Sequence, residues 1–267
     1  VRGGTAAGSA PPVAEVNEEA WRQYRGGPRH LGSIEANAPL AVSLRGADEL
    51  AHPLPVPPGH FQNRWEWLDR ATPPVSDGQL AYYGLSTGLL RAVRIEDGRE
   101  AWRFLAGGPI FMAPVLADGR LYAGCGDGWV YCLDAADGEL VWRWRAAPLE
   151  RTMAVYGKLI STWPVMAVLE VDGAIYGNAG LLQLNGWNSF ALDAASGQPR
   201  WTRWHDPVEL PTHYSWIEDS FGLVGYPALL GRDLVAKKYA CLPGVIDARS
   251  GLTPPADDDS RCTIIAW

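Results

Sequence analysis

Short apolar runs separated by Asp-Gly and Gly-rich turns fill the middle of the chain. Two stretches each carry four such runs, in the same order. The runs cover 110–117, 120–124, 129–133 and 140–145 in one stretch, and 165–171, 174–177, 189–192 and 199–203 in the other. Runs of this length joined by Asp-Gly-type hairpins are typical of antiparallel strands. The pattern predicts an all-β fold of four-stranded sheets.

An eleven-residue unit recurs in the same region. It covers residues 92–102, 132–142 and 191–201, and a weaker copy starts at 245 with Pro255 in the position of the final Trp. The glycines of the first two copies are separated by the ~40 residues that a four-stranded propeller blade needs. The repeat therefore predicts a β-propeller of four-stranded antiparallel blades.

The chemistry of the unit indicates how the blades hold together. A small residue ends one strand, an Asp starts a turn by accepting backbone N–H groups, and a Gly supplies the positive φ of that turn. The Trp of the next strand is then placed to wedge between neighbouring sheets. The predicted structural docking residues are Ala92, Gly98, Trp102, Cys132, Asp134, Gly138, Trp142, Ala191, Asp193, Gly197 and Trp201.

The copies also suggest how the chain is organised. We expect one propeller domain over 1–267, with an irregular N-terminal segment at 1–60 and blades over 61–267. Residues 22–90 are expected to hide one or two degenerate blades, with Trp65 or Trp67 as the docking residue. Because a closed ring needs more copies, we expect a fragment of a larger ring or a ring that another chain completes. The blades are clearest at 74–106, 107–146, 164–205 and 221–255.

Composition narrows the functional classes. The 267 residues include 13 Trp, 30 Gly and 21 Pro, which suits many turns and aromatic packing. The formal net charge of −7 argues against broad nucleic-acid binding, because contacts with phosphates require a basic surface. No run approaches the ~20 apolar residues of a membrane-spanning helix. The sequence predicts neither a nucleic-acid partner nor a membrane-spanning segment.

The four cysteines have no metal-binding spacing. Cys125, Cys132, Cys241 and Cys262 form no C-x-x-C pair, so structural zinc is not favoured. A Cys241–Cys262 disulfide is one of the pairings that the sequence leaves open. Cys125 and Cys132 are expected to be buried thiols, since cysteine packs as a small hydrophobic residue.

Other catalytic signatures are missing from the sequence. It contains no Gly-x-Ser-x-Gly elbow, no P-loop and no Gly-x-Gly-x-x-Gly dinucleotide fingerprint. His205 and His213 lie among acidic residues and are interpreted as solvated loop residues rather than metal ligands. No metal site is therefore predicted.

The repeat resembles the tryptophan-docking motif of propellers of the pyrroloquinoline quinone (PQQ) type, Ala-x-Asp-x-x-Thr-Gly-x-x-x-Trp. Residues 191–201 match it closely, with Ser196 at the Thr position, whereas Arg94 replaces the Asp of the motif in the first copy. Residues 132–142 depart from it at their first residue. The chain is thus similar to PQQ-like β-propeller repeat proteins of the quinoprotein alcohol dehydrogenase-like superfamily. The resemblance implies a periplasmic or extracellular location.

The catalytic branch of that superfamily is less well matched. Its alcohol dehydrogenases carry an adjacent Cys-Cys disulfide near the quinone, and a Glu/Asn/Asp set for calcium with an Asp base. This chain has no adjacent cysteines, and no local motif places the calcium set. We therefore expect no cofactor, with PQQ and calcium as the alternative.

Two inserted segments are the candidate ligand face. The first, residues 146–163, joins the outer strand of one blade to the inner strand of the next, where propellers usually bind ligands and where loops carry function. The second lies at 183–188 and is expected either to approach the same face or to decorate the rim. The alternative interpretation of the first is a capping loop, with its Trp as packing. The candidates are Arg151, Tyr156, Lys158, Ser161, Trp163, Asn185 and Trp187.

These observations favour a non-catalytic propeller that acts as a binding or assembly scaffold, or as a subunit of a larger complex. Other protein subunits are the expected partners. The alternative is part of a PQQ-dependent quinoprotein oxidoreductase that acts on alcohols or sugars. The repeat is specific for fold and weak for function, because propellers host many unrelated activities.

Overall fold

The described part of the chain is built from β-strands. The computed structural model describes residues 21–24, 71–155, 158–180, 185–206, 228–230, 233–237 and 243–250. Its named elements are all strands, which confirms the all-β prediction. Over these ranges, no helix has the length and apolar character needed to cross a membrane.

Three sheets have four antiparallel strands each, paired in chain order. The first contains β1 (Val75–Ser76), β2 (Leu80–Gly84), β3 (Leu89–Arg94) and β4 (Glu100–Leu105). The second contains β5 (Val115–Ala117), β6 (Arg120–Gly124), β7 (Trp129–Asp134) and β8 (Leu140–Arg145). The third contains β11 (Val165–Val171), β12 (Ala174–Ala179), β13 (Trp187–Asp193) and β14 (Pro199–His205).

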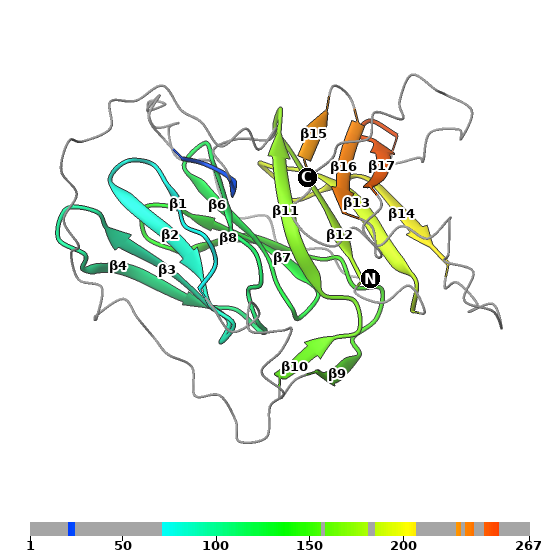
Figure 1. The fold of residues 1–267 in the computed structure, drawn as a ribbon, viewed down its shortest axis with the longest axis horizontal. Coiled ribbons are helices and arrows are strands. Elements are labelled where there is room, and N and C mark those ends of the chain that lie inside the picture. The colour runs from blue at the N-terminus through cyan, green and yellow to red at the C-terminus, as the bar shows by residue number, and fades with distance from the viewer. Residues whose placement is uncertain are drawn as a thin grey trace.

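Two smaller sheets complete the described structure. A three-stranded sheet contains β15 (Ala228–Leu230), β16 (Asp233–Lys237) and β17 (Pro243–Asp247), and a hairpin contains β9 (Thr152–Val155) and β10 (Lys158–Ser161). The inner strands β1, β5 and β11 contact one another in turn. The described sheets form an arc that does not close into a ring (Figure 1). This is an open array of propeller blades.

The strand predicted at 110–117 begins only at Val115, because the backbone before it bonds to neighbouring turns instead of a ladder. The Ile110 N–H donates to Leu85 O at 3.1 Å, and Pro109 O accepts from the Gly126 N–H at 2.7 Å. Strands of the third sheet are longer than predicted, since β12 reaches Ala179, and β14 reaches His205.

The sheets have two distinct ends. At one end the β5–β6 turn meets the β7–β8 turn, where the Ala135 N–H donates to Gly119 O at 2.9 Å. We call this the turn end. At the opposite end, the connection from β4 to β5 meets the β6–β7 turn through Pro109 and Gly126. We call this the insertion end, because the β9–β10 hairpin lies in the connection from β8 to β11.

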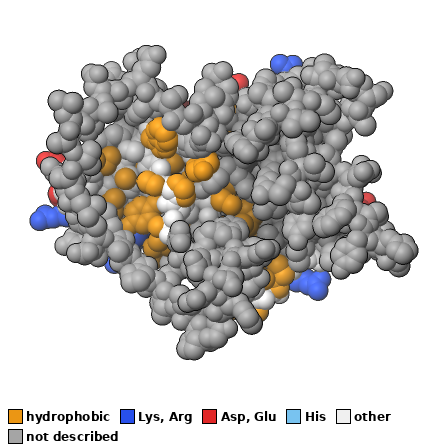
Figure 2. All heavy atoms as spheres, viewed as in Figure 1, with side chains coloured by type: hydrophobic (Ala, Val, Ile, Leu, Met, Phe, Trp, Pro, Cys, Tyr) orange, Lys and Arg blue, Asp and Glu red, His pale blue; other side chains and the backbone are white. Residues whose placement is uncertain are grey.

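The hydrophobic core lies between successive sheets. One cluster fills the space between the first two sheets and includes Tyr82 and Leu121, and another lies between the second and third and includes Tyr122 and Phe190. These side chains are almost completely buried. Among the side chains that Figure 2 colours by type, hydrophobic ones gather near the middle of the viewed face. Packing between sheets therefore supplies the apolar burial that stabilises the array.

Residues 21–24 tie the three inner strands together. The Ser76 N–H donates to Trp21 O at 2.7 Å, and the Leu116 N–H donates to Arg22 O at 2.8 Å. The Gln23 Nε2–H donates to the Glu170 carbonyl at 2.8 Å. Each bond reaches an inner strand of a different sheet, so this short segment links blades that are distant in sequence.

Candidate functional site

Three tryptophans of the repeat, each on the outermost strand of its sheet, reach the following sheet. All three lie at equivalent positions, on β4, β8 and β14. Each indole N–H donates to a carbonyl across the gap: Trp102 to Ala135 (2.8 Å), Trp142 to Ala194 (3.1 Å) and Trp201 to Ala248 (3.0 Å). The same contact thus joins three successive pairs of sheets.

Glycines of the repeat make room for these rings. Gly138 and Gly197 have φ values of 77° and 70°, a region that L-residues with a Cβ rarely adopt. A Cβ on Gly138 would lie 2.5 Å from the Trp102 ring, and one on Gly197 would lie 2.6 Å from the Trp142 ring. Both the turn and the close approach of the ring therefore require glycine.

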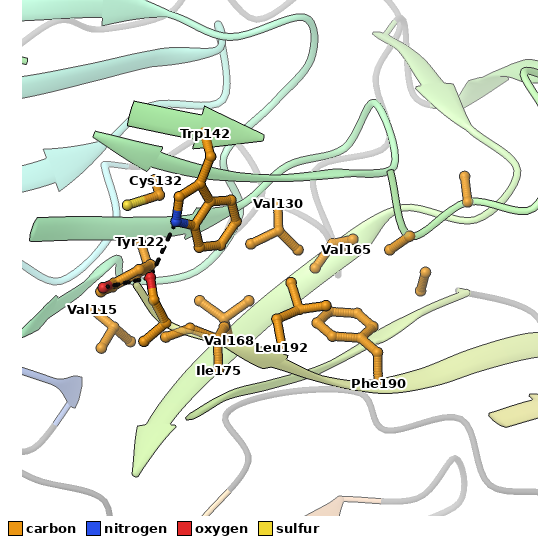
Figure 3. Close-up of a cluster of buried hydrophobic side chains, with 14 of the residues drawn as sticks. Val115, Tyr122, Val130, Cys132, Trp142, Val165, Val168, Ile175, Phe190 and Leu192 are labelled. Carbon is orange, nitrogen blue, oxygen red and sulfur yellow. Dashed lines mark hydrogen bonds between the residues drawn. The ribbon is translucent and has the colours of Figure 1, made fainter. Parts of the chain in front are cut away.

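A tyrosine accompanies each of these tryptophans. The Tyr122 and Trp142 ring centroids are 5.9 Å apart with the planes at 47°, and the Tyr122 hydroxyl also donates to Ala194 O at 3.2 Å (Figure 3). Burial and the neighbouring Cys132 raise the Tyr122 pKa, so the phenol stays protonated as a donor. A Tyr–Trp pair of similar geometry recurs in the first and third sheets.

The turn chemistry agrees with the sequence. The Asp134 carboxylate accepts the Ala136 N–H at 2.8 Å, and the Asp193 carboxylate accepts the Ser196 N–H at 3.0 Å. Gly98, Gly138 and Gly197 all have positive φ. The Asp and Gly residues of these turns thus have the contacts and the backbone conformation that tight turns require. The β5–β6 turn adds Asp118 and Gly119, both with positive φ, which is the type I′ pattern of tight hairpins.

The described part of the first inserted segment forms two paired strands, β9 and β10. Its inward residues belong to an apolar cluster that also draws on the β4–β5 connection and the start of β11. The Ser161 N–H donates to Gly126 O at 2.7 Å, which fixes β10 to the β6–β7 turn. The cluster is Phe111, Ile160 and Met166, with Met112, Met153 and Val155 packed against it.

The two inserted segments meet at the insertion end. The Trp163 Nε1–H donates to Asn185 O at 2.8 Å, and the Asn188 Nδ2–H donates to Ala146 O at 3.0 Å. Trp163 also contacts Trp204 edge-on, with ring centroids 6.3 Å apart. The sequence left open whether the second segment approaches the same face as the first or decorates the rim. These contacts show that it approaches the first segment.

The candidate ligand-face residues differ in accessibility. Ser161, Trp163 and Trp187 are buried, so their side chains support the face from below. Arg151 is exposed, whereas Lys158 and Asn185 are half-buried. Tyr156 lies outside the described residues. The most exposed apolar side chains of this segment are ones that the sequence did not single out, Leu149 at 62% and Leu159 at 71%.

A polar cluster in the third sheet also escaped prediction. The Ser189 hydroxyl donates to Asn178 Oδ1 at 3.0 Å and lies 3.2 Å from His205 Nε2. The His205 ring stacks on Trp187 with centroids 4.8 Å apart, and burial lowers the His205 pKa. The interpretation of His205 as a solvated loop residue was wrong, because β14 extends to it. Trp201 and His205 are four residues apart, so both side chains lie on the same face of an extended strand. This spacing was the sequence signal that the strand continues to His205. His213 lies outside the described residues.

The described residues do not fit a calcium–quinone site with an adjacent Cys-Cys disulfide. Cys125 and Cys132 are free and buried, as predicted, and burial raises the pKa of the Cys132 thiol to about 12. Within the described ranges, no group of three or more His, Cys, Asp or Glu is placed to hold a metal. No quinone step is assigned to these residues. Cys241 and Cys262 lie outside them.

Four-stranded sheets in an arc, each with a positive-φ Gly turn and an indole contact to the next sheet, define a PQQ-like β-propeller repeat protein. The family model described as outer membrane protein assembly factor BamB matches residues 17–235. The chain belongs to this family, and the resemblance stated from the repeat is confirmed.

One curated relative gives the extent of the likeness. The chain is 26% identical over 178 residues to the outer membrane protein assembly factor BamB of Burkholderia pseudomallei. The match covers 66% of this chain and 42% of that protein. The chain thus spans less than half the length of the curated relative that it matches.

Solved structures show the fold. The quinohemoprotein alcohol dehydrogenase ADHIIG of Pseudomonas putida HK5 has a TM-score of 0.53 at 16% identity, covering 70% of this chain and 34% of that one. The quinohemoprotein alcohol dehydrogenase of Comamonas testosteroni has a TM-score of 0.52 at 16% identity, covering 70% and 35%. At such identities the likeness concerns architecture, since one fold hosts many activities.

Proposed function

We propose that this chain is a non-catalytic scaffold subunit that binds protein partners in the assembly of outer membrane proteins. Membership of the BamB family supports the class of partner. The observation that carries the proposal is the β9–β10 hairpin, which is anchored by a buried cluster yet presents apolar side chains to solvent. A periplasmic location follows from this role.

The binding element is defined by four exposed residues, Leu149, Arg151, Ala154 and Leu159, which we call the hairpin surface. Leu159 is directly opposite Ala154 in the β9–β10 ladder. Arginine is enriched at protein–protein contact sites, and exposed leucines gain free energy when a partner removes them from water. The inward side chains of the hairpin pack against Phe111 and Met166, which anchors the two strands that carry the surface.

The repeated tryptophans have a separate role in this proposal. Trp102, Trp142 and Trp201 dock successive sheets and hold the array rigid behind the hairpin. A rigid support lowers the entropy lost when a partner binds. The docking residues therefore serve the binding surface without contacting the partner.

Site-specific photo-crosslinking in cells tests the proposal. A photoreactive residue at Leu159 is expected to capture a protein of the outer membrane assembly machinery, identified by mass spectrometry. The same residue at Leu140, which is 43% exposed at the turn end, is the control and should capture none. Equal capture at both positions contradicts the proposal.

The quinoprotein alternative has its own measurement. The full-length chain is mixed with PQQ and calcium, and quinone binding and dye-linked alcohol oxidation are followed. The scaffold proposal predicts no turnover. Tight quinone binding with turnover would replace it with the oxidoreductase interpretation.

A further inference from the structure

The third sheet carries a serine at a position that is apolar in the first two sheets. In each sheet this position lies two residues before the cross-strand partner of the repeat tryptophan. Leu90 in the first sheet and Val130 in the second are completely buried and belong to the clusters that fill the space before the next sheet. Ser189 has this position in the third sheet and is also buried. The third sheet thus presents a polar group where the other two present packed hydrocarbon.

Both cross-strand partners of Ser189 are polar as well. Asn178 lies beside it on β12, and Arg203 lies beside it on β14. The residue of the second sheet that is equivalent to Asn178 is Gly124, and a Cβ there would lie 2.7 Å from a methyl carbon of Val165. Because Asn178 carries a whole side chain, a neighbouring strand cannot approach it as closely as Val165 approaches Gly124.

The side chains of Asn178, Ser189, His205 and Trp187 form one connected cluster on this face. The Ser189 hydroxyl donates its proton to Asn178 Oδ1 at 3.0 Å, so at its 3.2 Å contact with His205 Nε2 it is the acceptor. The His205 ring in turn stacks on Trp187. Asn178, Trp187 and Ser189 are each at most 4% exposed. The cluster is therefore a buried polar network in which Asn178 Oδ1 is already used as an acceptor.

Each end of this network is a donor that lacks an acceptor. Among the described residues, no group accepts a hydrogen bond from Asn178 Nδ2 or from Trp187 Nε1, and both atoms are buried. Such donors are rare in folded proteins, because a buried hydrogen bond that is not made costs free energy. The nearby Asp206 carboxylate instead accepts the Trp204 indole N–H at 3.0 Å. The network thus needs an acceptor that these groups do not supply.

We propose that this face of the third sheet binds a carboxylate group. Asn178 Nδ2 and Trp187 Nε1 donate to its oxygens, and the Arg203 guanidinium supplies the positive charge. Arg203 is exposed beside the network, and within the described ranges no carboxylate pairs with it. A carboxylate accepts several hydrogen bonds and pairs strongly with a guanidinium. The site uses no residue of the hairpin surface, so it does not depend on the proposed function.

An NMR titration of the full-length chain with sodium acetate tests this site. Triple-resonance spectra assign the Trp187 indole N–H and the Asn178 side-chain amide. Both resonances are expected to shift and to saturate as acetate is added, because each N–H gains an acceptor. Sodium chloride at equal ionic strength and acetamide, which has the same shape without the charge, are the controls and should leave both resonances in place.

Arg203→Gln tests the charged part of the site. It should weaken the Kd for acetate roughly threefold or more, because an ion pair at an exposed arginine is lost. Arg145→Gln is the matched control, since Arg145 is an exposed arginine on β8, the corresponding outer strand of the second sheet. It should leave the Kd unchanged.

A short blocked peptide with a single Asp identifies the source of the carboxylate. Tighter binding of the peptide than of acetate assigns the site to an acidic side chain of a protein, and binding of acetate alone assigns it to a free organic acid. The proposal is overturned by resonances that acetate does not move, by equal shifts with acetamide, or by equal losses in the two arginine variants. The first two results come from the unaltered chain, so they decide the matter even where a variant fails to fold.

Discussion

At the turn end the sheets repeat one arrangement, whereas at the insertion end the two described connections from one four-stranded sheet to the next are different. The Asp–Gly turn and the crossing indole recur in the second and third sheets with nearly the same angles and distances. The connection from β8 to β11 instead adds a hairpin and exposed leucines. Repetition at one end stabilises the array, and irregularity at the other end supplies a surface that can be specific.

The largest effect is expected from removing a crossing indole. Trp142→Ala should lower the free energy of unfolding by about 3–5 kcal/mol, because it empties a packed site between two sheets. Trp204→Ala, at a side chain that is 44% exposed at the insertion end, is the control. Urea denaturation should show a much smaller loss of unfolding free energy for the control. Equal losses would mean that the turn end does not stabilise the array more than the insertion end.

The glycines sharpen this contrast within the turn end itself. Gly119→Ala should cost about 1–2 kcal/mol, which is the strain of a Cβ in the left-handed region. Gly138→Ala should cost roughly 1–3 kcal/mol more, because its methyl collides with the Trp102 ring. Thermal or urea unfolding of the two variants measures the difference, and equal costs would mean that the ring is not packed on Gly138.

The sequence predicted the turn end better than the insertion end for a physical reason. Turns need Asp and Gly at fixed positions and leave a legible pattern, as at Asp193 and Gly197. The hairpin depends on tertiary contacts among Phe111, Ile160 and Met166, which no local motif encodes. The segment at 152–161 was therefore found as an insertion, but its strands were not.

His205 illustrates the same limit. Its burial comes from stacking on Trp187 and from the neighbouring Ser189, contacts that span two strands. When only the sequence is considered, a histidine near acidic residues resembles a solvated residue of a loop. Local composition misleads wherever the strand continues past the recognisable repeat.

A smaller, pH-dependent effect is expected at this histidine. Burial lowers the His205 pKa below its ordinary 6.5, so the unfolded state binds the proton more readily. The contribution of His205 to stability is then complete above pH 6.5 and is lost as the pH falls through the folded pKa. His205→Gln should flatten the fall in unfolding free energy on acidification below pH 6.5. An unchanged pH profile would show that this histidine does not titrate with folding.

The smallest change in stability is expected at the hairpin surface, where the functional effect is greatest. Leu159→Asp should alter the free energy of unfolding by less than about 0.5 kcal/mol, because the side chain is 71% exposed. Circular dichroism and urea unfolding check this. A large destabilisation would mean that the leucine is structural.

The decisive measurement is partner binding by that same variant. The full-length chain, Leu159→Asp and the turn-end control Leu140→Asp are titrated into a purified outer membrane protein assembly complex that lacks this subunit. The scaffold account predicts at least a tenfold weaker Kd for Leu159→Asp, which corresponds to about 1.4 kcal/mol, and no change for Leu140→Asp. Unchanged binding by Leu159→Asp, or equal losses in both variants, would contradict it.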